Sequence, residues 1–362
     1  MATSTIHHPV RIDGPTLVRA ATSGIPGNLL TSPQMPANVK FLVIDPLIFT
    51  HAYFLLGEQP QRFTNDLSLY LACIRTFFER ADVEGGIKIP EIANSDSKRR
   101  LSEDLGVGIA AYFMVDVFGL QWGSISQIPQ NSKLSKKRPD FQGYGATGRD
   151  IFEAKGTTKL TKIEPALSKA IGQVKGYPEQ AEAKIAVITY LSADERFFPS
   201  SSFVVDPPAM PEAVPPDEST SRMLHFEKAL QFAGKPEAAK IYLRDLSLLL
   251  RESKRENTVP DAFLPYYQPP KTTGIDRITI SRTEPSHIEV VQAYGFEFEG
   301  RTYHSEGVTV FTGMERKTLE AGLAFTGPDT PLQKFTEESD GASTSVFDDG
   351  TLLRIVLPKL SA

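Results

Sequence analysis

The stretch Arg138-Pro139-Asp140-Phe141, followed shortly by Asp150-Ile151-Phe152-Glu153-Ala154-Lys155-Gly156, decides the fold that we expect. Alternate residues of a strand share a face, so Glu153 and Lys155 should point to the same side. Asp140 lies one hairpin away and adds a second carboxylate. Two carboxylates hold a hard cation such as Mg²⁺ through oxygen, and a neighbouring lysine orients a water or stabilises developing charge. The stretch therefore predicts a cation site with a built-in base.

A plainer interpretation is a surface hairpin in which Lys155 forms a salt bridge. In that case Asp140 and Glu153 would lie close together as like charges without a cation, which is unfavourable. The spacing therefore favours the cation site.

The residues that follow predict a helix and then a buried strand. A helix over 161–177 carries an apolar stripe that includes Leu167, Ala170 and Val174. A strand over 184–191, Lys-Ile-Ala-Val-Ile-Thr-Tyr-Leu, comes next, and a last strand is expected over 202–206. Upstream, a buried helix is expected to start at Ser95 or Asp96 and to run toward Phe118.

Pro139-Asp140 and Glu153-Ala154-Lys155 resemble the PD-(D/E)xK nuclease superfamily, in the family's usual spacing. Gln173 and Tyr177 resemble the Gln-x-x-x-Tyr element of its RecB-like members. The resemblance covers residues 95–206. It implies an α/β fold with a restriction-endonuclease-like αβββαβ core and a mixed sheet.

The resemblance also implies roles for individual residues. Asp140, Glu153 and Lys155 would be catalytic, and the supporting residues would be Glu103, Gln173 and Tyr177. The metal ligands would be Asp140, Glu153, the backbone carbonyl of Ala154 and Glu103, with Mg²⁺ as the cofactor and Mn²⁺ as its substitute. Glu103 has an equally good second interpretation, as a first-turn acid favoured by the helix dipole.

Charge is distributed unevenly along the chain. The net charge is −5, yet residues 131–175 hold ten basic and four acidic residues. A basic patch around a carboxylate site suits a polyanion such as DNA. The expected nucleic-acid-binding residues are Lys136, Lys137, Arg138, Lys159 and Lys169. The alternative is that these lysines only solvate a surface.

Composition is that of an ordinary soluble globular protein, at 40% hydrophobic and 23% charged residues in 362. The single cysteine, Cys73, fits a reducing interior, so we expect a cytoplasmic protein. The longest apolar region, 41–56, is too short to span a bilayer, and no membrane partner is expected.

We expect four parts in the chain. Residues 1–90 form an N-terminal extension with a strand and a helix, 91–206 the nuclease core, and 207–222 a Pro-rich linker. Residues 223–362 form a helical and then β-rich module.

Within the outer parts, the five prolines in 1–37 predict an arm or loops, 39–49 predicts a strand and 65–81 a helix. Residues 121–128 predict the first core strand, and the glycines of 141–148 a hairpin loop. Two helices are expected over 223–253, split near Gly234-Lys235-Pro236.

Strands are expected in the last third of the chain, at 277–281, 287–291, 308–311 and 352–357. Another is expected over 294–303, with a hairpin turn at Glu299-Gly300. Residues 334–345 are expected to be polar and exposed.

The leading hypothesis is a divalent-metal-dependent deoxyribonuclease, an endonuclease of restriction or antiviral defence, acting alone, as a homodimer or with a partner subunit. The alternative is a catalytically silent subunit that keeps the fold and serves in DNA binding or assembly. A third hypothesis is a different metal-dependent phosphoesterase, which no His/Asp cluster supports.

Overall fold

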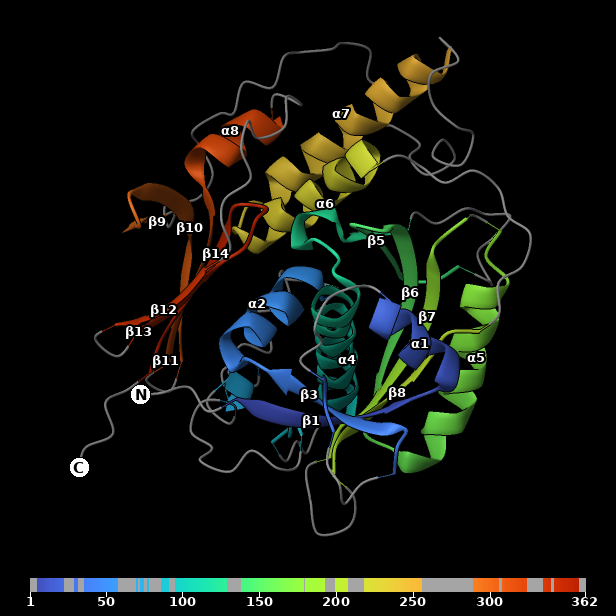
Figure 1. Ribbon diagram of the computed structural model, residues 1–362. Coiled ribbons are helices and arrows are strands. Elements are labelled where there is room, and N and C mark those ends of the chain that lie inside the picture. Colours follow the sequence, from blue (N-terminus) through green and yellow to red (C-terminus); the bar gives the residue numbers. More distant parts are fainter. Residues whose placement is uncertain are drawn as a thin grey trace, which may run out of the picture.

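The computed structural model places two sheets on either side of a layer of helices (Figure 1). It describes residues 5–22, 29–31, 36–57, 70, 72–74, 77, 86–90, 95–128, 138–178, 180–192, 199–207, 218–255, 289–305, 308–323, 335–339 and 342–357. The fold is α/β, as the sequence predicted at this coarse level.

The larger sheet of the described residues has eight strands in the order β2-β3-β1-β8-β7-β6-β5-β4. It is mixed, because β6 pairs parallel with β7 and β1 parallel with β8, while its other neighbours are antiparallel. The strands are β1 (Ile6–Ile12), β2 (Leu29–Leu30), β3 (Val39–Ile44), β4 (Ser126–Gln127), β5 (Phe141–Gly145), β6 (Gly148–Thr157), β7 (Ala183–Tyr190) and β8 (Ser201–Val205).

Helices α4 (Ser95–Phe118) and α5 (Ile163–Lys175) cover opposite faces of this sheet (Figure 1). The alternation along β7 explains the arrangement: Ile185 and Val187 join the main core with α4, whereas Ala186 and Ile188 pack against α5. A strand that is buried on both faces has a continuous apolar sequence, and this pattern predicted β7 correctly. The two helices were also predicted correctly, from their own sequence patterns.

The second sheet is antiparallel throughout, in the order β12-β13-β14-β11-β10-β9. Its strands are β9 (Glu289–Ala293), β10 (Phe296–Ser305), β11 (Val308–Glu315), β12 (Phe335–Ser339), β13 (Ala342–Val346) and β14 (Thr351–Val356). The accompanying helices are α6 (Glu218–Phe232), α7 (Pro236–Arg255) and α8 (Arg316–Leu323). The predicted split between two helices near Gly234 is confirmed, and Gly234 has φ 74°.

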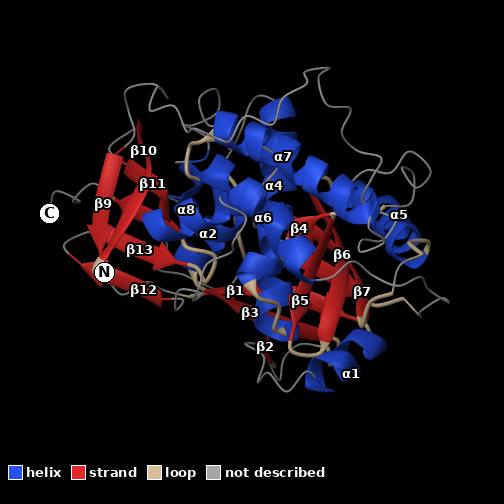
Figure 2. Cartoon of the chain, turned by 90° about the horizontal axis from the view of Figure 1, so that it is seen from above, coloured by secondary structure: helices blue, strands red, loops and turns tan. Residues whose placement is uncertain are grey.

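Helices α2 (Pro46–Leu56), α4 and α6 lie between the two sheets (Figure 2). One hydrophobic cluster joins them, because it holds residues of β1, α2, α4, β7, α6, β11 and β14. At its centre the Trp122 ring stacks on Phe347 of the C-terminal part, with centroids 4.5 Å apart. The two sheets therefore share one core.

The N-terminal expectation of an arm or loops over 1–37 is wrong in part. Residues 6–12 form β1, which lies between β3 and β8, and α1 (Gly14–Thr22) follows. Proline does not interrupt this region: Pro15 is in the first turn of α1, where a missing N–H costs nothing, and Asp13 caps that helix by accepting from Thr16 N.

The strand expected over 39–49 ends early, and the apolar run to 56 is not a strand. Strand β3 stops at Ile44, and α2 then begins at Pro46. Asp45 is its N-cap and accepts from Leu47 N and Ile48 N at 2.8 and 3.2 Å. Helix α2 is buried almost all round, which hides the helical period in a uniformly apolar sequence.

Three further expectations need correction. The strand expected over 121–128 is a 3₁₀ turn, η2 (Trp122–Ser124), followed by the two-residue β4. The hairpin turn lies at Tyr294-Gly295 and not at Glu299-Gly300, since both turn residues have positive φ and β10 runs on without a break. The stretch expected to be polar and exposed contains the paired strands β12 and β13, in which Ala342 and Ser345 are buried.

The glycine-rich stretch 141–148 is mostly strand: β5 extends to Gly145, and only the turn before Gly148 is loop. Helix α6 begins at Glu218, inside the expected linker. Most of the predicted helix 65–81, the predicted strand 277–281 and linker residues 208–217 lie outside the described residues. Within the described part, no helix is long and apolar enough to cross a membrane.

Candidate metal and active site

The structure brings Asp140, Glu153 and Lys155 together. Asp140 immediately precedes β5, and the antiparallel register pairs Phe141 with Phe152, so Asp140 comes opposite Glu153. Lys155 Nζ forms an ion pair with Glu153 Oε1 and lies 3.4 Å from Asp140 Oδ2. The lysine ammonium is thus shared between the two carboxylates.

Strand alternation places this group on the face of the sheet that α5 covers. In the parallel ladder Glu153 pairs with Ala186 and Lys155 with Ile188, and both of these apolar residues pack against α5. Phe152 and Ala154 point the other way, into the main core. The predicted shared face of Glu153 and Lys155 agrees with this register.

Burial differs sharply among the three side chains. Glu153 is fully buried, whereas about 31% of the Asp140 side chain and 29% of that of Lys155 are exposed. Burial raises the pKa of Glu153, the charge of Asp140 raises it further, and Lys155 opposes both effects. Burial lowers the pKa of Lys155, but Asp140 and Glu153 outweigh it, so that pKa is raised.

The buried carboxylate of Glu153 is only partly satisfied. Its Oε1 pairs with the Lys155 ammonium, and its Oε2 has no hydrogen bond among the described residues. A buried carboxylate with few donors is costly unless further charge completes its environment. Glu153 therefore suits an additional cationic ligand.

The donor set fits a hard divalent cation with few protein ligands. Mg²⁺ commonly takes one or two carboxylates and keeps several waters, which Asp140 and Glu153 could satisfy. Across the residues that the structure describes, no group of three or more His, Cys, Asp or Glu side chains is placed to hold a metal ion. A site built here would rest on two carboxylates.

Glu103, the third expected carboxylate, is not brought into this group. It lies on α4, is about 42% exposed, and pairs with Arg99 one turn earlier at 3.1 Å. Its backbone passes close to Gly156, so α4 lies beside the end of the site strand. The alternative interpretation of Glu103 as a first-turn acid is also wrong, because α4 begins at Ser95 and the acid of its first turn is Asp96.

Gln173 contacts the segment that carries Asp140. Its Nε2 donates to Arg138 O at 2.8 Å, and Ile128 N donates to Asp140 O at 3.0 Å. Arg138 also donates through Nη1 to Ile128 O at 2.6 Å. The backbone from 138 to 140 is therefore held from two sides, while the expected contact of Arg138 with nucleic acid stays a prediction.

The remaining predicted residues fall in different places. Tyr177 is buried beside Ile151, and its carbonyl accepts from Lys184 Nζ at 2.8 Å. Ala154 N donates to Asp140 Oδ2 at a long 3.4 Å. Lys159 and Lys169 are exposed, while Lys136 and Lys137 lie outside the described residues.

Two glycines lie in close contact beside Lys155: Gly106, which the sequence predicted to allow close packing of the helix against a sheet, and Gly156, which sequence reasoning overlooked. A Cβ on Gly156 would lie 1.5 Å from Ser102 O, and one on Gly106 would lie 2.6 Å from Gly156 N. Helix α4 and strand β6 are thus in backbone contact beside the site. The signal was present, since Gly156 directly follows Lys155 and Gly106 interrupts a helix.

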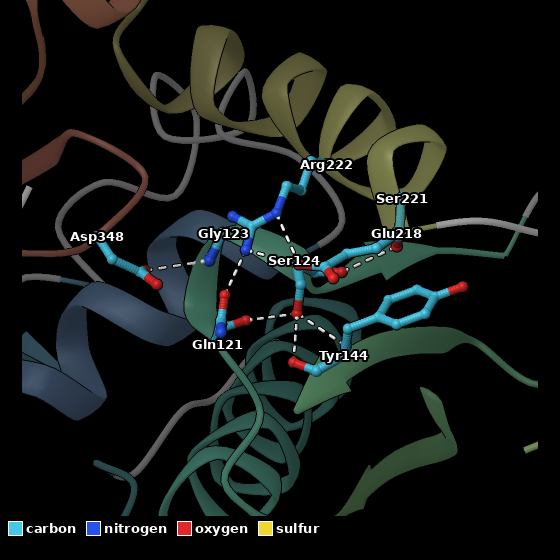
Figure 3. A network of polar contacts seen from close by, with 8 residues as sticks. All are labelled: Gln121, Gly123, Ser124, Tyr144, Glu218, Ser221, Arg222 and Asp348. Carbon is cyan, nitrogen blue, oxygen red and sulfur yellow. Dashed lines mark hydrogen bonds and ion pairs between the residues drawn. The ribbon is translucent and has the colours of Figure 1, made fainter. Parts of the chain in front are cut away.

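A second overlooked feature is a polar seam between the edge of the large sheet and α6 (Figure 3). Ser124 Oγ donates to Tyr144 O at 2.9 Å, Tyr144 N donates back to Ser124 Oγ at 2.8 Å, and Ser221 Oγ of α6 donates to Ser124 O at 2.9 Å. Because Tyr144 belongs to β5, the seam joins α6 to the hairpin that follows Asp140.

No protein-family model, no curated protein and no solved structure matches this chain.

Proposed function

We propose that this protein is a divalent-metal-dependent nuclease that hydrolyses phosphodiester bonds in DNA. The observation that carries the proposal is the fully buried carboxylate of Glu153, which pairs with Lys155 and lies beside a second carboxylate, that of Asp140. A buried acid whose pKa is raised by burial and by a second carboxylate is typical of functional sites.

The order of elements supports a restriction-endonuclease-like core. Helix α4, strands β4, β5 and β6, helix α5 and strand β7 follow one another as the αβββαβ pattern requires. The site lies on the interior strand β6, opposite the start of β5. This placement agrees with the resemblance of Pro139-Asp140 and Glu153-Ala154-Lys155 to the PD-(D/E)xK motif.

Asp140 and Glu153 would hold the metal, with Mg²⁺ as the expected ion and Mn²⁺ as its substitute. When bound, such an ion polarises a phosphoryl oxygen and lowers the pKa of a bound water. Lys155 is partly exposed and already contacts both carboxylates. Its ammonium is placed to orient the attacking water or to donate to a phosphoryl oxygen as charge develops.

In the hydrolysis, a bond forms between the water oxygen and phosphorus, and the bond from phosphorus to one sugar oxygen breaks. The water loses one proton to the site or solvent, and the leaving oxygen gains one. Gln173 would act on Asp140 indirectly, since its amide holds the carbonyl of Arg138 two residues earlier.

DNA is the proposed substrate because of the basic stretch around the site. Lys159 and Lys169 are exposed on the elements that follow β6. We further propose a cytoplasmic role in restriction or antiviral defence, alone, as a homodimer or with a partner subunit. These last points rest on resemblance and composition alone.

One observation favours the catalytically silent alternative. Lys155 already forms ion pairs with both carboxylates, and the described residues offer no group of three His, Cys, Asp or Glu side chains that could hold a metal ion. A subunit that keeps the fold for DNA binding or assembly would retain such an ion-paired cluster without binding metal.

Cleavage of supercoiled plasmid and linear DNA with Mg²⁺ or Mn²⁺ tests the proposal. Asp140→Asn and Lys155→Ala should each slow cleavage by about 10²-fold or more, because each removes a group that acts on the reacting atoms. Lys240→Ala is the matched control, since Lys240 is an exposed lysine on α7 whose removal changes the charge equally. Equal cleavage by the wild type, Asp140→Asn and Lys155→Ala would overturn the assignment.

A further inference from the structure

A buried histidine, away from the candidate active site, joins the two sheets. His225 lies on α6 and is 2% exposed. Its Nδ1 lies 2.5 Å from Ile125 O, at the edge of the large sheet, and its Nε2 lies 2.7 Å from Asp349 Oδ2, in the turn between β13 and β14. Three segments that are distant in sequence therefore meet at one imidazole.

Both partners of this imidazole are hydrogen-bond acceptors. A neutral imidazole carries one N–H, so one ring nitrogen would face an acceptor with its lone pair. The imidazolium has two N–H groups and satisfies both contacts. The geometry alone thus calls for the charged form.

We propose that protonated His225 is a lock that docks the C-terminal sheet onto the large sheet, so that this docking depends on pH. The lock connects Ile125, α6 and Asp349, and losing its proton turns one of its two hydrogen bonds into a repulsive contact. The inference does not rest on the proposed nuclease function.

Asp349 is held as a carboxylate by donors of its own strand turn. Thr351 N and Thr351 Oγ1 reach Asp349 Oδ1 at 2.8 and 2.6 Å. Thr351 Oγ1 is also 2.9 Å from Nε2 of His51 on α2, whose ring stacks on Phe347 at 3.7 Å. The acceptor for His225 is therefore fixed in place from the C-terminal side.

Each element that packs against His225 contributes charged or titratable groups. The turn between β13 and β14 carries Asp348, which accepts from Gly123 N at 3.2 Å. Helix α6 carries Arg222 and Glu218, which pair at 2.8 Å, and α2 carries His51. Burial lowers the pKa of His225, but the hydrogen bond and charge of Asp349 outweigh it, and the pKa is raised. Burial raises the pKa of Asp349, yet His225 lowers it overall.

The sign of the pH effect follows from these directions. The histidine contribution to stability is complete below its ordinary pKa of 6.5 and is lost as pH rises through the higher folded value. The aspartate contribution is complete above its ordinary 3.8 and is lost as pH falls through the lower folded value. The contacts of His225 therefore stabilise the docking of the two sheets most between these limits, and this stabilisation is lost as pH rises above the upper one.

Two measurements on the full chain test the lock. The first is a ¹³C-histidine titration by NMR, in which the His225 signal is the one missing from His225→Gln. The second is hydrogen exchange of β11, β13 and β14 against β6 and β7 from pH 5.5 to 9, corrected for intrinsic exchange rates. Asp349→Asn keeps the side-chain shape and a hydrogen-bond acceptor but removes the charge.

We expect His225 to titrate above 6.5, and the opening constant of the C-terminal strands to rise by up to about tenfold per pH unit across that titration. Asp349→Asn should lower the pKa of His225 and move the opening to lower pH. His304→Gln, at an exposed histidine of β10, should leave both unchanged. A His225 pKa at or below 6.5, or C-terminal exchange that is independent of pH, would overturn the proposal.

Discussion

Glu153 is the residue on which the candidate site depends. It is fully buried, it lies beside a second carboxylate, and the two carboxylates share a single ammonium. The folded protein is therefore less stable whenever Glu153 is charged and no metal ion is bound. Sites that bind or react commonly carry such a stability cost.

The first prediction concerns this cost. Since the pKa of Glu153 is raised in the folded protein, the free protein should lose stability as pH rises through that pKa. Glu153→Gln keeps the shape, removes the charge and leaves Asp140 as the partner of Lys155, so it should be more stable than the wild type at pH 8.5. Urea unfolding with a chelator, at pH 5.5 and 8.5, measures the difference.

The same experiment identifies the opposite case. If Glu153→Gln is destabilised equally at both pH values, the charged carboxylate stabilises the fold through its lysine, and Glu153 carries no strain for a ligand to relieve. Glu103→Gln is the control, because Glu103 is an exposed acid that pairs only across one turn.

Much of the site could be predicted at this scale, and the reason is local. Asp140, Glu153 and Lys155 are joined by one hairpin, so strand alternation and a short connection suffice to bring them together. Glu103 could not be settled, because its distance from Glu153 depends on how α4 crosses the sheet. The contact of Arg138 with Ile128 could not be predicted for the same reason, since it crosses a strand pairing that the sequence does not reveal.

Among the elements, the contact between α4 and β6 is the closest one beside the site. Gly156 and Gly106 allow the two backbones to touch, with no room for a Cβ at either position. Because neither glycine has a side chain, β6 and its Lys155 can lie this close to α4.

The second prediction follows from this contact. Gly156→Ala should destabilise the protein by about 3 kcal/mol, because its methyl group would meet the carbonyl oxygen of Ser102 and backbone must move. Gly172→Ala is the matched control on the exposed side of α5, where a Cβ meets nothing within 4 Å. It should stabilise the protein by about 0.5–1 kcal/mol. Thermal or urea unfolding of both variants measures these changes in stability. Equal changes for Gly156→Ala and Gly172→Ala would show that the contact between α4 and β6 has room for a methyl group.

Secondary structure was predictable where burial alternates and not where it is uniform. Helix α5 has one apolar side and β7 lies between two helices, so both gave clear patterns. Helix α2 is buried nearly all round, and its sequence shows no period; only Asp45 and Pro46 mark its start. Strand β4 has two residues, too few for any periodicity.

At the scale of the whole molecule, the two sheets share a core and a seam. The main hydrophobic cluster runs from β1 to β14, and the Ser124–Ser221 contacts tie α6 to the large sheet. The sequence could indicate each strand but not this union, because pairings such as β1 with β8 join residues that are almost two hundred positions apart.

The third prediction is that unfolding is cooperative across both sheets. Trp122 is the chain's one tryptophan and stacks on Phe347, so its fluorescence reports the junction. Circular dichroism at 222 nm reports mainly the helices, including α4 and α5. Urea curves from the two probes should coincide. An earlier fluorescence transition would mean that the C-terminal part detaches before the rest unfolds.

The most direct test of the central claim is calorimetric titration of Mn²⁺ and Mg²⁺ into the protein, because it needs no knowledge of the substrate. Titrations in two buffers of different ionisation enthalpy at pH 7 also count the protons released. We expect binding at one site per chain with proton release, since Glu153 must lose its proton to bind a cation. Glu153→Gln and Asp140→Asn should abolish it, and Glu103→Gln should not. No binding, or binding that is unchanged in Glu153→Gln and Asp140→Asn, would contradict the assignment of these carboxylates as a metal site.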